Sequence, residues 1–280
     1  MYKIAIAENS EKNYIFLENL EGGNIARICL NEGGRITNLI VNHTEIITDK
    51  TSGKYEEDFA SAILFPFANR IKNGEYAFNN IKYKLDCNEN TGKNAIHGLV
   101  YDKYFEVVRV EAQQDSASVT LSYIESVGCD GFPFKYFIIL KYTLNKEGLS
   151  LKVVAKNIDE KPFPFTIGWH PYFLSTDLSQ SQLSFQSNKK FKSDTNGIVI
   201  DKEDFNEDMP IHLNKKTFDD AFVLDSHIVT FMTPVYQLEL KSSSVNNFLQ
   251  IYTPEHTETI AIEPMTGVAN SINNQIGKQI

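Results

Sequence analysis

Apolar and polar residues alternate along much of the chain, and this alternation predicts strands. Between residues 134 and 144 a large apolar side chain stands at every second position. Turn-forming residues follow at 145–148 and the alternation resumes at 149–155, which predicts a β-hairpin. Similar runs occur at residues 14–17, 25–30, 36–41, 76–85, 105–111, 117–123, 228–232, 235–240, 248–253 and 259–263. Many short strands predict an all-β sandwich or barrel.

Helical periodicity is scarce, so few and short helices are expected. The best candidate lies between Tyr55 and Leu64, where three apolar residues share a helical face, and a flanking glycine and proline limit it to a few turns. The segment from Lys161 to Ile167 predicts an edge or rim strand, although it contains two prolines. The polar stretch from Gln186 to Asp208 is expected to be a long surface loop. Composition does not change across it, so residues 1–280 are expected to form a single domain.

Composition narrows the class of partner. The 280 residues carry 27 basic and 36 acidic side chains, a net charge of −9, which disfavours nucleic acid and anionic membranes as partners. No apolar run approaches the ~18 residues of a membrane span, and the first residues are unlike a signal peptide. We therefore expect a cytoplasmic protein with a small-molecule partner. Oligomeric state has no signature in the sequence. Cys29, Cys87 and Cys129 are far apart and offer neither a disulfide framework nor a sulfur-rich zinc site.

Two polar residues in the first half of the chain stand out as candidates for chemistry. Arg70 follows an apolar neighbourhood, where a guanidinium needs a partner. It could pair with a core carboxylate, or its planar fork of donors could bind the hydroxyls of a polar ligand. His97 precedes Gly98, which permits a close backbone approach. Taken alone, a histidine is more often a hydrogen-bonded core or rim residue than a catalyst.

The second half of the chain supplies stronger candidates. His170 stands between Trp169, the only tryptophan, and Pro171. Aromatic neighbours are typical of a sugar pocket, and the alternative is an aromatic core corner. Glu263 is expected to end an apolar strand before Pro264, at the sheet rim. Partial desolvation there raises a carboxyl pKa toward the range useful for a general base.

The remaining candidates are a carboxylate doublet and a possible metal set. Asp219 and Asp220 stand between phenylalanines and could form a loop end or an Asx-type turn. His97, His170 and Glu263 could form a two-histidine, one-carboxylate metal site. Such sites usually draw two ligands from one local motif, such as His-x-His, and no such motif occurs. We therefore expect no metal. The sequence contains no glycine-rich phosphate loop, so we expect no nucleotide cofactor either.

Five segments resemble those of the aldose 1-epimerase (galactose mutarotase) family in order and rough spacing, most closely a shorter bacterial-type branch. They are Asn69-Arg70, His97-Gly98, Trp169-His170-Pro171-Tyr172-Phe173, Asp219-Asp220-Ala221-Phe222 and Glu263-Pro264-Met265-Thr266-Gly267. The resemblance spans most of the chain. It implies one catalytic domain over residues 1–280, a large antiparallel β-sandwich with a sugar cleft across one sheet, and a mutarotase of a free aldose that needs no cofactor.

The resemblance also implies roles for individual residues. His170 would be the general acid toward the ring oxygen, Glu263 the general base toward the anomeric hydroxyl, and His97 a further group at the ring oxygen. The implied sugar-binding residues are Asn69, Arg70, Asp219 and Tyr172. Asp219 fits the family spacing, and Asp220 stays open as the alternative.

The chemistry of anomer interconversion explains why a general acid and a general base are both needed. Interconverting anomers breaks the C1–O5 bond while O1 loses a proton, so an acid and a base act on one hemiacetal. The rate should then fall in acid as Glu263 gains a proton and in alkali as His170 loses one.

The alternatives to a mutarotase of free aldoses are a hexose-6-phosphate mutarotase and a non-catalytic sugar-binding protein of the same fold. A glycoside hydrolase would normally need two carboxylates flanking the scissile bond.

Overall fold

Strands dominate the computed structural model, which describes residues 1–8, 11–19, 21–49, 54–90, 92–214, 216–255 and 258–274. Its helical elements are the single turn α1 (Tyr55–Asp58) and the 3-10 turns η1 (Lys72–Gly74) and η2 (Leu178–Gln180). The predicted all-β fold class is confirmed. No helix in these ranges is long and apolar enough to cross a membrane.

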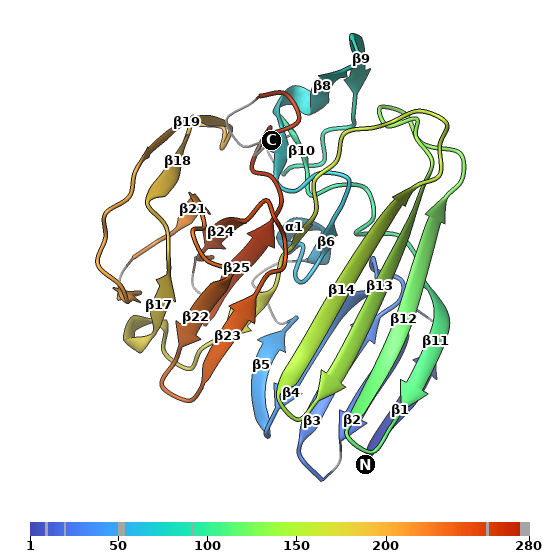
Figure 1. Cartoon of the computed structure of the whole chain (residues 1–280), viewed down its shortest axis with the longest axis vertical. Coiled ribbons are helices and arrows are strands. Elements are labelled where there is room, and N and C mark those ends of the chain that lie inside the picture. The colour runs from blue at the N-terminus through green and yellow to red at the C-terminus, as the bar shows by residue number, and fades with distance from the viewer. Residues whose placement is uncertain are drawn as a thin grey trace.

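One large antiparallel sheet runs through the molecule (Figure 1). In spatial order its strands are β1 (Tyr2–Glu8), β2 (Asn13–Asn19), β3 (Asn24–Cys29), β4 (Arg35–Val41), β5 (Thr44–Thr48), β16 (Tyr172–Leu174), β25 (Thr259–Met265), β24 (Phe248–Tyr252), β21 (Asp219–Val223), β18 (Lys189–Ser193) and β19 (Val199–Asp204). The short strands β15 (Gly168–Trp169) and β6 (Ile63–Leu64) attach to it beside β25. Segments from both ends of the chain therefore meet in one sheet.

Two four-stranded sheets pack against the large one. The first, β11 (Glu106–Ala112), β12 (Ser116–Glu125), β13 (Tyr136–Asn145) and β14 (Gly148–Asn157), lies over β1 to β4 (Figure 1). The second has the order β20 (Ile211–His212), β17 (Gln182–Phe185), β22 (Ile228–Met232) and β23 (Gln237–Lys241). It packs on the C-terminal part of the large sheet, where the Phe185 and Phe222 ring centroids are 5.0 Å apart.

Two short strand pairs complete the fold. β7 (Arg70–Ile71) pairs with β10 (Ala95–Ile96), and β8 (Glu75–Phe78) pairs with β9 (Ile81–Lys84). Asn79 and Asn80 have φ values of 50° and 64° and form the tight turn between β8 and β9, so the alternating run at 76–85 comprises two strands.

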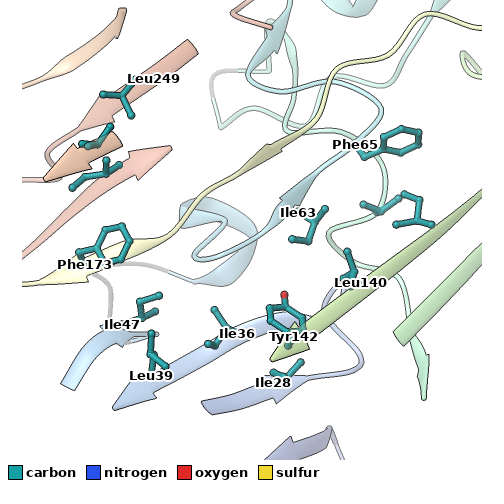
Figure 2. Close-up of a cluster of buried hydrophobic side chains, with 14 of the residues drawn as sticks. Ile28, Ile36, Leu39, Ile47, Ile63, Phe65, Leu140, Tyr142, Phe173 and Leu249 are labelled. Carbon is teal, nitrogen blue, oxygen red and sulfur yellow. The ribbon is translucent and has the colours of Figure 1, made fainter. Parts of the chain in front are cut away.

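The core fills the space between the large sheet and its covers (Figure 2). Ile28 and Ile36 from the large sheet are fully buried, as are Leu140 and Tyr142 from β13. Burying one such aliphatic side chain contributes ~1.5–3 kcal/mol relative to exposure. The Tyr142 hydroxyl donates to the Gly34 carbonyl at 2.9 Å, so this buried polar atom is satisfied.

In the C-terminal strands, the alternation of apolar and polar residues places polar side chains on the face of the large sheet opposite the core. Leu249, Ile251 and Ile262 belong to the core. Gln250 and Glu263 stand directly opposite each other across β24 and β25, and the period of two places both on the other face. This face carries the candidate site.

The helix expected between Tyr55 and Leu64 is wrong beyond Asp58. Phe59 and Ser61 adopt left-handed conformations, with φ of 51° and 59°, and the chain then enters β6. The Phe59 ring packs on His97 at a centroid distance of 4.9 Å. Tertiary packing overrides the local periodicity at this position.

Two further expectations need correction. The stretch from Gln186 to Asp208 contains the hairpin β18–β19 rather than one long loop. Phe191 is buried on one face, and cross-strand ion pairs such as Lys192–Glu203, at 3.1 Å, make the other face polar. Between Lys161 and Ile167 the described chain forms no strand, since its prolines lack backbone donors.

Candidate active site

His170 is fixed by its backbone and by an aromatic neighbour. Its N–H donates to the Ala62 carbonyl at 3.1 Å, and its carbonyl accepts from the Ser61 N–H at 2.7 Å. The imidazole stacks on Tyr172, with centroids 5.0 Å apart and 19° between the planes. The Tyr172 hydroxyl donates to the Asp58 carbonyl at 3.3 Å. Tyr172 thus lies behind His170 and holds the orientation of the ring.

Glu263 lies beside His170 within the large sheet. β25 continues past Pro264, so the expectation that Glu263 ends its strand at the rim is wrong. Glu263 Oε1 is 3.4 Å from His170 Nε2, and the two side chains are 2% and 6% exposed. Glu263 Oε2 has no hydrogen-bond partner among the described residues. A buried carboxylate oxygen left in this way costs stability, which is typical of a group retained for chemistry.

His97 completes a cluster of three buried groups. It has φ of 61°, and its ring lies edge-on to His170 with centroids 4.9 Å apart. The next residue, Gly98, has φ of 82°, and a Cβ there would lie 2.3 Å from the Phe65 carbonyl oxygen. Only glycine permits this approach. Within the described chain, Nδ1 of His97 and of His170 have no hydrogen-bond partner.

A polar row extends the site along the sheet. Gln250 Nε2 donates to Asp219 Oδ1 at 2.8 Å, and Gln250 Oε1 accepts from Asn69 Nδ2 at 3.5 Å. Asp220 lies on the opposite face of β21 and pairs with Lys190 at 2.7 Å. The geometry therefore brings Asp219, rather than Asp220, to the site. The sequence reasoning missed Gln250, although a lone amide within Phe-Leu-Gln-Ile-Tyr signals a buried polar position.

Arg70 reaches the same face from β7. Its Nε donates to Glu89 Oε1 at 2.6 Å, and its NH1 donates to Asn69 Oδ1 at 3.3 Å. The expected alternative of a carboxylate partner is thus confirmed, with Glu89 as that partner. The Arg70 side chain is still 20% exposed and can take part in ligand binding as well.

Burial controls the protonation of the central groups. It lowers the pKa of His170 to about 4. It also lowers the pKa of His97 well below its usual value, with His170 and Arg70 adding to the effect. Burial raises the pKa of Glu263 well above its usual value, assisted by Asp219 and opposed by Arg70. Glu263 therefore keeps its proton to higher pH than His170, so the expected assignment of the two pH limbs is reversed.

Comparison with known proteins decides the family, because residues 19–279 match the family described as aldose 1-epimerase. The chain belongs to the aldose 1-epimerase family. The uncharacterized protein YihR of Escherichia coli is 28% identical over 226 residues, which cover 76% of this chain and 72% of YihR. The bifunctional protein gal10 of Schizosaccharomyces pombe is 23% identical over 258 residues, 79% of this chain but only 36% of gal10.

Solved structures confirm the galactose mutarotase-like sandwich. A galactose mutarotase-like protein from Clostridium acetobutylicum superposes with a TM-score of 0.87 at 20% identity, covering 98% of this chain and 91% of that one. Galactose 1-epimerase from Lactobacillus acidophilus gives a TM-score of 0.77 at 17% identity, covering 99% and 93%. At these identities the likeness establishes the fold.

The histidine–glutamate cluster of this family member also has the composition of a metal site. One possible ligand atom from each of His97, His170 and Glu263 lies within 4.8 Å of the other two. Two imidazoles and a carboxylate suit a divalent transition metal. The donor set therefore fits a metal, and the expectation of a metal-free site stays a prediction.

Trp169 does not join this cluster. It lines a separate groove of about 1060 Å³ between β14 and β23, on the face of the large sheet opposite the cluster. Its ring packs edge-on against Phe173, with centroids 6.4 Å apart. Since neighbouring strand residues point to opposite faces, the aromatic neighbour that supports His170 is Tyr172 instead.

Glu263→Gln is expected to stabilise the fold at neutral pH. Unfolded Glu263 ionises near its ordinary pKa, while the folded state holds the proton to higher pH, so stability falls as pH rises through this window. Glutamine removes that loss. We expect the variant to gain about 1 kcal/mol or more at pH 7 and little at pH 4, measured by urea unfolding at both pH values.

The exposed Glu106→Gln provides the matched control and should show no such pH-dependent gain. Equal or lower stability of Glu263→Gln at pH 7 would contradict a buried carboxyl whose pKa is raised by desolvation.

Proposed function

We propose that the protein is an aldose 1-epimerase that interconverts the α and β anomers of a free aldose. The observation that supports this most strongly is the buried contact between His170 Nε2 and Glu263 Oε1 at 3.4 Å, where Glu263 Oε2 has no hydrogen-bond partner among the described residues. In this proposal Glu263 takes the proton from O1 and His170 delivers a proton to O5. The ring opens, the C1–C2 bond rotates, and the reverse transfers close it as the other anomer.

The proton inventory of the pair is consistent with this cycle. The pair must hold one proton, because two protons leave no base and none leaves no acid. The opposite pKa shifts keep this one-proton state over a wide pH range, with the proton resting on Glu263. In the proposed cycle this proton first passes from Glu263 Oε1 to His170 Nε2 across the 3.4 Å contact, which gives the carboxylate that accepts the O1 proton and the imidazolium that protonates O5. His97 lies beside His170 and is proposed to assist at the ring oxygen.

The polar row is proposed to hold the sugar hydroxyls. Asn69, Arg70 and Asp219 would bind them, and Gln250 joins these residues because it bonds to Asp219 and Asn69. Tyr172 was expected to contact the sugar. Since it is 2% exposed and its hydroxyl is already bonded, we infer that it acts by supporting His170.

The charges around the row favour a neutral sugar over a hexose 6-phosphate. Among the described residues, Arg70 is the only cation that acts on both Asp219 and Glu263, and it is already paired with Glu89. Asp220 and Glu89 add negative charge near Asp219. A phosphate dianion would meet net repulsion there.

The stability cost of burying His170 beside Glu263 argues against a sugar-binding protein without catalysis. Simple binding does not require a buried acid and base whose hydrogen bonds are incomplete. We also infer that residues 1–280 act as one catalytic domain, because the site draws on elements from β7 to β25. The cytoplasmic location stays a prediction.

The first test is the reaction itself. Freshly dissolved α-glucose, α-galactose, xylose and arabinose are followed by polarimetry with EDTA-treated protein. We expect at least one sugar to equilibrate faster than in buffer. Glu263→Gln and His170→Asn should each lower kcat by ~10²-fold or more, since each removes one proton transfer. The double variant should lose much less than the product of the two effects.

Buffer rates for all four sugars, both with EDTA-treated protein and after Zn²⁺ is added back, would refute the enzyme proposal. Activity lost in EDTA and restored by Zn²⁺ would instead place a metal among His97, His170 and Glu263. Circular dichroism of each variant checks that it remains folded.

The carboxylate doublet offers a matched pair for testing the binding row. Asp219→Asn should raise KM by ~10-fold, because it removes a charged acceptor from the sugar. Asp220→Asn, which breaks the ion pair with Lys190 on the opposite face of β21, should leave KM within about twofold, since Asp220 does not face the binding row. KM is measured with the sugar that the wild type turns over fastest. The reverse ranking would assign the substrate to Asp220.

A further inference from the structure

Two nitrogens of the Arg70 guanidinium already donate hydrogen bonds to other residues of the protein in the absence of a ligand. Nε is bonded to Glu89 at 2.6 Å and NH1 to Asn69 at 3.3 Å. NH2 makes no hydrogen bond within the part of the chain that the structure describes. The charge of Arg70 also acts on His97, Asp219 and Glu263, which places the guanidinium among the site residues.

Glu89 is itself held in place. Its Oε2 accepts from Asn94 Nδ2 at 2.8 Å, while its backbone N–H donates to the Asn94 carbonyl at 3.2 Å. Asn94 is buried, and its Oδ1 accepts from the Asn73 N–H at 3.1 Å. One carboxylate oxygen is therefore fixed by the protein and the other is presented to Arg70.

A turn of the β18–β19 hairpin covers the guanidinium. Gly197 has φ of 71°, and a Cβ there would lie 2.8 Å from Arg70 NH1 and 2.9 Å from Cζ. The preceding Asn196 carbonyl accepts from Asn94 Nδ2 at 3.4 Å, which ties this turn to the residue that holds Glu89. Arg70 is thus confined by Glu89, by Asn69 and by the turn.

The geometry points to Glu89 as a positioning residue that holds Arg70 in the orientation that binds the sugar hydroxyls. This inference rests on the proposed function. An arginine side chain loses rotamer entropy when it is fixed in one orientation. If Glu89 fixes it in advance, the sugar does not bear that cost on binding, so affinity is gained through preorganisation.

The inference predicts a change in KM rather than in kcat. Glu89→Ala should raise KM by ~10-fold while kcat changes less than threefold. Glu89→Gln keeps an oxygen acceptor for Arg70 Nε and should restore part of the loss. Glu203→Ala, which removes a more exposed ion pair with Lys192 at 3.1 Å, is the control and should leave KM unchanged.

A double-mutant cycle separates positioning from a general structural role. If Glu89 acts through Arg70, then Glu89→Ala should raise KM little further in an Arg70→Ala background. A full further increase, or an unchanged KM in Glu89→Ala alone, would overturn the inference. Should Glu89→Ala fail to fold, Glu89→Gln with and without Arg70→Ala serves as the cycle, with the same readings.

The same samples distinguish this inference from the proposed function. Dissociation constants for galactose and glucose are measured by NMR titration beside the rates. A wild type that binds sugar without catalysis refutes the proposed function, and the ratio of dissociation constants then tests Glu89 in place of KM. A wild type that neither binds nor turns over sugar overturns both.

Discussion

Burial of an acid and a base side by side is the constraint on which the rest of the site depends. Water is largely excluded from His170 and Glu263, and the charged form of each is disfavoured. In the part of the chain that the structure describes, neither group has an ion-pair partner other than the other member of the pair. The fold must therefore carry an electrostatic cost at this point and supply the stability elsewhere, from the apolar core between the sheets.

The β-sheet solves the problem of placing polar groups next to such a core. In β24 and β25 the period of two gives one face to the core, through residues such as Leu249 and Ile262, and the other to Gln250 and Glu263. Loops with left-handed residues at Phe59 and His97 then bring the remaining groups to this face. Since these loops contact one another, their positions are set jointly.

The sequence predicts what is local and misses what is tertiary. Alternation located strands such as β13, β14 and β22, because burial on one face imposes the period. It did not reveal the β18–β19 hairpin. One face of that hairpin carries ion pairs, so its sequence is as polar as that of a surface loop. The resemblance placed His170, Glu263 and Asp219 in one site. Glu89 carries no such signal, because its role depends on Asn94 and on a turn about a hundred residues away.

The pH dependence of kcat/KM tests the account most directly, because it reports the protonation of the free enzyme. We expect a bell-shaped dependence of kcat/KM on pH. Its acid limb should lie near pH 4, set by His170, and its alkaline limb should be set by the raised pKa of Glu263. Glu263→Gln should abolish the alkaline limb in the residual activity. An acid limb near ~6.5, the ordinary histidine value, or an alkaline limb that persists in Glu263→Gln, would contradict the claim that burial sets the proton inventory of this pair.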